Sequence, residues 1–160
     1  MGRYLYQNSQ FDMTNAVFEF IKSLNLTGKT LDVGSLHVNG DVRSLFQDYT
    51  GLDMRPGRNV DVVADAHALP FEAWSFDNVV CLEMLEHDSD PFRSMTEIRR
   101  VLKIGGTIAL TVPGIGFPKH DYPSDYWRFT ADGARVLLSM FDKVEVKEDR
   151  DHIFAVAKKQ

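Results

Sequence analysis

The chain of 160 residues has the length of one domain, and 44% of its residues are apolar, which is enough for a buried core. Its 18 basic and 23 acidic residues leave a net charge of −5, which disfavours nucleic acid as a partner, because nucleic-acid binding needs a concentrated basic face. No apolar run is long enough to span a membrane, and the single cysteine excludes an internal disulfide. We therefore expect a single cytoplasmic domain over residues 1–160, without a membrane partner, and we leave an oligomer open.

The first half of the chain alternates helical and strand-like patterns. Apolar residues on one stripe predict an N-terminal helix, and these are Phe11, Val17, Phe18, Ile21 and Leu24. Short apolar runs predict strands, and these runs are 29–35, 50–57, 59–66 and 75–84. A short helix is predicted over 41–49, between the first two strands.

The second half begins with the clearest helix signal. Asp90 is a natural N-cap and Pro91 suits the first helical position, while Gly105 and Gly106 are expected to end this helix. A fifth strand is predicted over 107–113, and a last helix is expected to begin after Thr130. Residues 143–159 read as two strands joined by a charged turn.

Strands that alternate with helices indicate an α/β fold with a largely parallel sheet covered on both faces. The turn near residues 148–151 is too short for a helical crossover, so the two terminal strands are expected to run antiparallel. The pattern predicts a Rossmann-like three-layer sandwich that differs from an ordinary dinucleotide-binding sheet.

In such sheets, ligands bind at the carboxyl ends of the strands. Gly34 follows the first strand and allows a sharp turn, although glycine is also common in ordinary turns. Asp53 follows the second strand, where an acid can accept both hydroxyls of a ribose, and Met54 can lie against a flat base. Asp65 and the N–H of Ala66 suit the edge of an adenine, although an aspartate here can equally cap a turn. Together these residues predict a nucleoside pocket without a phosphate site, which fits S-adenosyl-L-methionine.

Glu83, Glu86 and His87 follow the fourth strand closely. One histidine and two carboxylates on a single loop are weak grounds for a metal site, and we expect no metal here.

Three blocks of the sequence resemble the class I S-adenosylmethionine-dependent methyltransferases, and most closely the small-molecule group called methyltransferase type 11. The blocks are LDVGS, YTGLDMRPG and the long block VVADAHALPFEAWSFDNVVCLEMLEHDSDPFRSMTEIRRVLKIGGTIALTVP. The resemblance implies a seven-stranded sheet whose last strand is antiparallel. It also implies that Gly34, Ser35, Leu82 and Glu83 face the cofactor, with Asp53 and Met54 at the adenosine and Asp65 and Ala66 at the adenine edge. The cofactor half would span 28–112, after an N-terminal lid or helix over 1–27.

The long loop over 113–129 lacks a regular pattern, and a loop of that length in a compact domain is usually functional or disordered. We expect it to line the acceptor side of the pocket, as the substrate loop of a segment over 113–160 that also contains the last helix and the terminal hairpin. Aromatic faces attract a sulfonium cation and Arg128 can hold an anionic group, so the expected acceptor-binding residues are Tyr122, Tyr126, Trp127 and Arg128. The alternative is that Trp127 and Phe129 pack on the core and Arg128 pairs with a surface acid.

A base is needed only when the acceptor carries a proton as it attacks, and the candidates are His87, His120 and Asp121. The leading hypothesis is methyl transfer to a small-molecule acceptor. A non-catalytic binding module, or a subunit of a methyltransferase complex, is the main alternative. A nicotinamide-dependent oxidoreductase is disfavoured, because the GxGxxG motif is absent.

Overall fold

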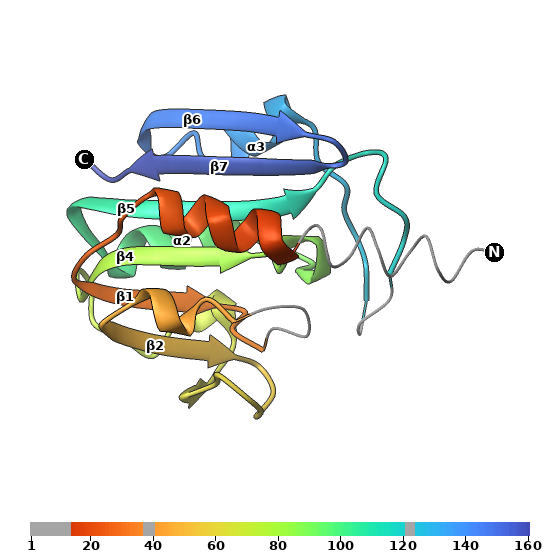
Figure 1. Cartoon of the computed structure of the whole chain (residues 1–160). Coiled ribbons are helices and arrows are strands. Elements are labelled where there is room, and N and C mark those ends of the chain that lie inside the picture. Colours follow the sequence, from red (N-terminus) through yellow and green to blue (C-terminus); the bar gives the residue numbers. More distant parts are fainter. Residues whose placement is uncertain (1–13, 37–40, 121–123) are drawn as a thin grey trace.

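The computed structural model describes residues 14–36, 41–120 and 124–160, and it contains a seven-stranded sheet in the order β3-β2-β1-β4-β5-β7-β6. The strands are β1 (Lys29–Val33), β2 (Asp48–Asp53), β3 (Val62–Val63), β4 (Phe76–Leu82), β5 (Leu102–Pro113), β6 (Asp142–Asp149) and β7 (His152–Lys158). Strands β1 to β5 pair in parallel, whereas β7 is antiparallel to both β5 and β6. The arrowhead of β7 accordingly points opposite to those of its neighbours (Figure 1). The predicted fold class is therefore confirmed, including the antiparallel terminal strand.

Helices cover both faces of the sheet and make three layers. A helix over residues 14–23 lies across one face, and helices α2 (Pro91–Val101) and α3 (Ala131–Leu137) lie on the other (Figure 1). Neighbouring residues of β4 show the division, because Val79 belongs to the apolar cluster under α2 and α3, whereas Val80 belongs to the cluster under the first helix. This alternation is what a strand buried on both faces requires.

The predicted caps of the two later helices are present. The side chain of Asp90 accepts a hydrogen bond from the N–H of Arg93 at 3.3 Å, and Pro91 occupies the first turn of α2. Thr130 caps α3 by accepting from the N–H of Gly133 at 3.0 Å. These local signals were readable because a capping side chain needs only its own neighbours in sequence.

The predicted end of α2 at the two glycines is wrong. The helix ends at Val101, Leu102 already has an extended backbone, and β5 begins there. Gly105 instead takes a φ of 78°, and Gly106 lies so close to β4 that a Cβ on it would stand 2.8 Å from the main-chain oxygen of Asp77. The pair therefore forms an irregularity inside β5, where the register with β4 shifts.

The predicted helix over 41–49 is also wrong. Only one 3₁₀ turn, η1 (Arg43–Leu45), forms there, because Phe46 is extended and β2 begins at Asp48. The residues that lie before the extended Phe46 are too few for an α-helix.

The order of the strands indicates which edge of the sheet can bind a ligand. Strand β1 lies between β2 and β4, so the chain reverses its direction of travel across the sheet at this point. Clefts form at the carboxyl ends of strands beside such a reversal. No helix within the described residues is long and apolar enough to cross a membrane.

Candidate cofactor and acceptor site

A cavity of about 420 Å³ lies at the carboxyl ends of β1 to β4. This volume falls in the range of about 300–1,000 Å³ that is usual for small-molecule sites. Its lining comes from the segments that follow each strand and includes Gly34, Leu36, Asp53, Met54, Arg55, Ala64, Asp65, Ala66, His67, Glu83, Met84, His87, Asp88, Ser124 and Tyr126.

Asp53 stands at the tip of β2 and is held by main-chain donors. Its Oδ1 accepts from the N–H of Arg55 at 2.9 Å, and its Oδ2 lies 3.4 Å from the N–H of Leu36. A carboxylate offers about four acceptor positions, so capacity for two further hydroxyl donors remains. Met54, beside it, is 62% exposed and lines the same cavity. These features fit a ribose and a base.

Asp65 and Ala66 lie at the start of a 3₁₀ turn, η2 (Ala66–Ala68), after β3. Oδ1 of Asp65 accepts from the N–H of His67 at 2.8 Å, so this aspartate does cap a turn, and it also lines the cavity. The imidazole of His67 is in turn fixed by Asp88, with 2.7 Å between Nε2 and Oδ1. Sequence reasoning missed this second pair, because the two residues are 21 positions apart.

The loop after β1 is tightly packed. Gly34 has a φ of 86°, and a Cβ on it would stand 2.5 Å from Cγ of Met84.

Glu83, which follows β4, also has a positive φ, 52°, and its Oε2 lies 3.4 Å from Nε2 of His152. Ser35 and Leu82 are expected cofactor residues, but the structure buries both side chains, and neither belongs to the cavity lining.

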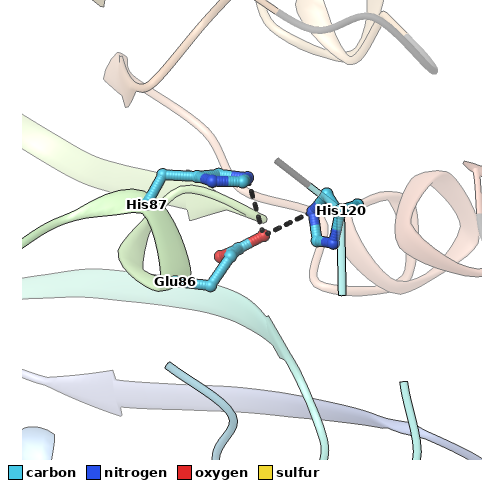
Figure 2. Close-up of side chains that lie close together, drawn as sticks. All are labelled: Glu86, His87 and His120. Atoms are coloured by element: carbon cyan, nitrogen blue, oxygen red, sulfur yellow. Dashed lines mark ion pairs between the residues drawn. The ribbon is translucent and has the colours of Figure 1, made fainter. Parts of the chain in front are cut away.

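Glu86, His87 and His120 form a close cluster beside the cavity, which His87 also lines (Figure 2). The Glu86 side chain is 0% exposed, and Nε2 of His87 and Nε2 of His120 lie 3.6 and 3.7 Å from its Oε1. Burial raises the pKa of Glu86 to about 7, while the nearby carboxylate raises the pKa of His120. The two imidazole rings meet edge to face, with 4.9 Å between their centres.

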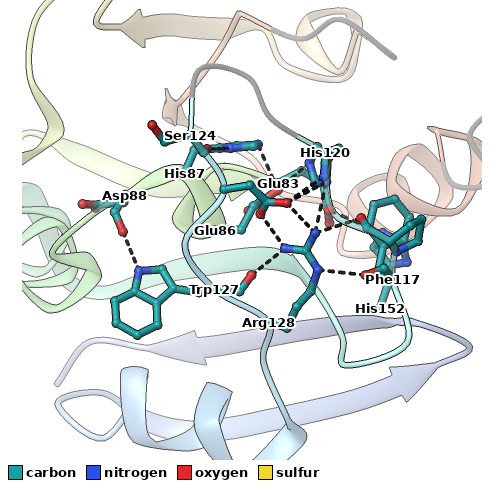
Figure 3. A network of polar contacts seen from close by, with 12 residues as sticks. Glu83, Glu86, His87, Asp88, Phe117, His120, Ser124, Trp127, Arg128 and His152 are labelled. Atoms are coloured by element: carbon teal, nitrogen blue, oxygen red, sulfur yellow. Dashed lines mark hydrogen bonds and ion pairs between the residues drawn. The ribbon is translucent and has the colours of Figure 1, made fainter.

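The loop after β5 docks on the 3₁₀ turn η3 (Leu85–His87) that follows β4. The N–H of Tyr126 donates to the main-chain oxygen of Glu86 at 2.7 Å, and the indole Nε1 of Trp127 donates to that of Asp88 at 2.7 Å. Figure 3 shows this segment lying across η3. The loop thereby brings His120 next to Glu86.

Arg128 organises the same loop from within (Figure 3). Its guanidinium binds both carboxylate oxygens of Asp125 at 2.5 and 2.6 Å and donates to the main-chain oxygens of Phe117 and Pro118 at 2.9 and 2.8 Å. The pKa of Asp125 falls to about 2, chiefly because of this hydrogen-bonded pair. Arg128 thus pairs with an acid, as the alternative interpretation held, but that acid is buried and not at the surface.

The structure therefore brings together most of the residues expected at the site. Those that line the cavity are Gly34, Asp53, Met54, Asp65, Ala66, Glu83, His87 and Tyr126. His120, Trp127 and Arg128 lie in the adjoining loop. Asp121, Tyr122 and the first 13 residues lie outside the described residues.

The sheet order and the strand-end cavity define a Rossmann-like methyltransferase fold. A "SAM-dependent methyltransferase, possible histamine N-methyltransferase" from Thermotoga maritima superimposes with a TM-score of 0.76 at 15% identity, over 99% of this chain and 97% of that one. The 1,6-didemethyltoxoflavin-N1-methyltransferase of Burkholderia thailandensis, solved with its substrate and S-adenosylhomocysteine, gives a TM-score of 0.70 at 17% identity, over 99% and 82%.

The family follows from the sequence match. Residues 31–110 match the family model described as "Methyltransferase domain", and the chain belongs to this family. The "Ubiquinone biosynthesis O-methyltransferase" of Dechloromonas aromatica (strain RCB) is 31% identical over 123 residues, which are 77% of this chain and 44% of that protein. The chain thus spans less than half the length of this curated relative. The predicted resemblance to class I S-adenosylmethionine-dependent methyltransferases is confirmed.

Proposed function

We propose that this chain transfers the methyl group of S-adenosyl-L-methionine to a small-molecule acceptor. The observation that carries the proposal is that Asp53 and Asp65, from the tips of β2 and β3, line one cavity in a methyltransferase fold. Two acids at neighbouring strand ends suit the ribose and the adenine of one adenosine.

The residues present fit this cofactor. Asp53 would accept the ribose hydroxyls, Met54 would cover the adenine face, and Asp65 with Ala66 would pair with the adenine edge. The buried Oε1 of Glu83 accepts no hydrogen bond from the described residues and lies on the side where the amino-acid part would end. The bound cofactor supplies an activated methyl group on a sulfonium, so the protein mainly aligns the acceptor and excludes water.

The acceptor would enter beside His87 and Tyr126, which both line the cavity. His87 is within reach of this space, and its Nδ1 is already fixed by the main-chain oxygen of Ser124. We infer that the loop over 113–129 chooses the acceptor, because it supplies Ser124 and Tyr126 to the lining.

Calorimetric titration of the full chain with S-adenosylmethionine, S-adenosylhomocysteine and NAD tests the cofactor. We expect the first two to bind and NAD not to bind. A panel of hydroxyl and amine acceptors with methyl-labelled cofactor then tests transfer. Failure of both sulfur compounds to bind would refute the proposal, whereas tight binding without transfer to any acceptor would favour the non-catalytic module.

A further inference from the structure

We propose that Glu86, His87 and His120 bind one divalent transition-metal ion, and that Zn²⁺ suits them best. One ligand atom from each of the three residues lies within 4.8 Å of the other two (Figure 2). Two imidazole nitrogens and one carboxylate oxygen form a ligand set that catalytic zinc sites use, with the fourth position left open. From the sequence alone, one histidine and two glutamates on one loop are weak grounds for a metal, whereas His120, 34 positions beyond Glu86, joins the cluster only in the folded chain.

The carboxylate of Glu86 is the first reason to place a cation here. Its side chain is completely buried, and neither oxygen accepts a hydrogen bond from the described residues. A buried carboxylate without partners is costly unless it is paired or coordinates a metal. The histidine nitrogens face Oε1 at 3.6 and 3.7 Å, too far for good hydrogen bonds. A metal ion bound at this point would neutralise the carboxylate.

The second partner of His87 fits metal ligation. Nδ1 of His87 faces the main-chain oxygen of Ser124, which can only accept, so Nδ1 carries the proton and Nε2 presents its lone pair. Nδ1 of His120 has no such acceptor at hydrogen-bond distance, because it lies 3.4 Å from the donor Nη2 of Arg128 and 3.7 Å from Oδ2 of Asp125. Ligating histidines are commonly oriented by a carbonyl or a carboxylate at their other nitrogen.

Distance and charge agree with a divalent ion. Two ligands that are each 2.0–2.1 Å from tetrahedral zinc stand about 3.3 Å apart, close to the two observed separations between glutamate and histidine. The charged groups that face one another here are Glu83, Glu86, Asp125 and Arg128. Carboxylates outnumber the guanidinium among these groups, which favours a cation at this point.

His87 joins this cluster to the cavity, because it also belongs to the lining. The open coordination position would take an acceptor oxygen and lower the pKa of its hydroxyl. This role rests on the proposed function, whereas the metal site itself does not.

Zinc titration of the full chain tests the site, using protein without a polyhistidine tag, stripped with EDTA and freed of cofactor. We expect one Zn²⁺ per chain by calorimetry and by metal analysis. Mutation of a residue that only orients a metal ligand costs about 10–100-fold in metal affinity. Because E86Q, H87A and H120A each remove a ligand itself, each should weaken Zn²⁺ binding by at least about 100-fold. H67Q is the matched control, because this histidine also lines the cavity but lies outside the cluster, and it should keep the wild-type affinity.

Two outcomes overturn the metal site. In one, the wild-type chain binds Zn²⁺ no more tightly than the H87A/H120A double variant. In the other, E86Q and H120A keep wild-type affinity. Binding of S-adenosylmethionine to each variant shows that the fold is intact, and the visible absorption of bound Co²⁺ reports the ligand change directly. Failure of the wild-type chain to bind the cofactor would count against the proposed function and would leave the metal result standing.

Discussion

The indole nitrogen of Trp127 donates to the main-chain oxygen of Asp88 at 2.7 Å, and so ties the loop after β5 to the segment after β4. Both segments start at the ligand-binding edge of the sheet, and both contribute to the cavity. The two segments that contribute to the cavity are therefore mechanically connected.

We expect Trp127→Phe to loosen this connection while keeping much of the ring's packing. Loss of one hydrogen bond should lower the free energy of unfolding by about 1 kcal/mol. Amide exchange at Tyr126, which donates to Glu86 beside the lost bond, should become faster. Trp74→Phe, at an indole that is 61% exposed, is the control and should change neither measurement appreciably. Unaltered exchange at Tyr126 would show that the indole does not hold the loop.

Asp53→Ala should weaken the binding of S-adenosylmethionine by about 10–100-fold, because two ribose hydroxyls would lose a charged acceptor, an effect of roughly 1.5–3 kcal/mol. Calorimetry measures this directly. Asp48→Ala, at the exposed opposite end of β2, should leave the affinity unchanged. Equal affinities for the wild type and Asp53→Ala would refute the ribose assignment.

Gly34→Ala and Gly105→Ala form a matched pair, since both glycines have φ near 80°. A side chain in this region costs about 1–2 kcal/mol. At Gly105 nothing lies within 4 Å of the new Cβ, so we expect only this cost, whereas at Gly34 the methyl group meets Met84 and the loss should be clearly larger. Urea unfolding measures both, and Met84→Ala should recover part of the extra loss. Equal losses at the two glycines would contradict the packing described here.

Arg128→Lys should destabilise the protein by at least about 2 kcal/mol, because lysine cannot reproduce a two-point contact with a buried carboxylate. Arg135→Lys is the control, because its partner Asp132 is 93% exposed, and it should cost less than about 0.5 kcal/mol. The comparison again uses urea unfolding. A small effect at Arg128 would mean that Asp125 finds other donors.

Acid should weaken the hydrogen bonds by which Asp77 of β4 joins Lys29 of β1 and Lys103 of β5. The hydrogen bonds from Lys103, at 2.7 Å, and from the N–H of Lys29, at 2.9 Å, lower the pKa of this carboxyl below its ordinary value. A lowered pKa in the folded state stabilises the protein above the ordinary pKa, and this contribution is lost as the pH falls through the lowered value. The difference in unfolding free energy between pH 7 and pH 3 should therefore be smaller for Asp77→Asn than for the wild type.

A double-mutant cycle is the control for this acid effect. The free energy of unfolding is measured for Asp77→Asn, for Lys103→Gln and for the variant that combines both changes. The two changes should be less than additive, because each removes the same contact. Strict additivity, or an unaltered pH dependence in Asp77→Asn, would exclude the interaction as a source of acid sensitivity. The effect should also shrink at high salt, because both side chains are partly exposed.

Sequence reasoning succeeded where the signal was local or periodic. Asp90, Pro91 and Thr130 marked helix starts correctly, and the convergence of Asp53 and Asp65 followed from the rule for parallel strand ends. It failed at Gly105 and Gly106, since a glycine that ends a helix and one that forms an irregularity in a strand look alike in sequence.

The rest of the site depends on how distant loops dock. The contact of Glu86 with His120 and the order imposed by Arg128 and Asp125 arise only after the loop folds onto η3. The alternative in which Trp127 packs on the core does not hold, because Trp127 is 43% exposed and is not among the residues packed against the buried apolar clusters. Sequence pattern alone does not encode which face of an irregular loop meets its neighbour.

The reversed direction of β7 determines what each end of the terminal hairpin can reach. Because β7 starts where β5 finishes, His152 stands opposite Pro113 and beside Glu83, while Gln160 lies at the far rim of the sheet (Figure 1). A fluorescent reporter or an immobilisation handle joined after Gln160 would thus leave the cleft unobstructed. An insertion between the hairpin strands would instead lie at the edge of the sheet where β5 ends.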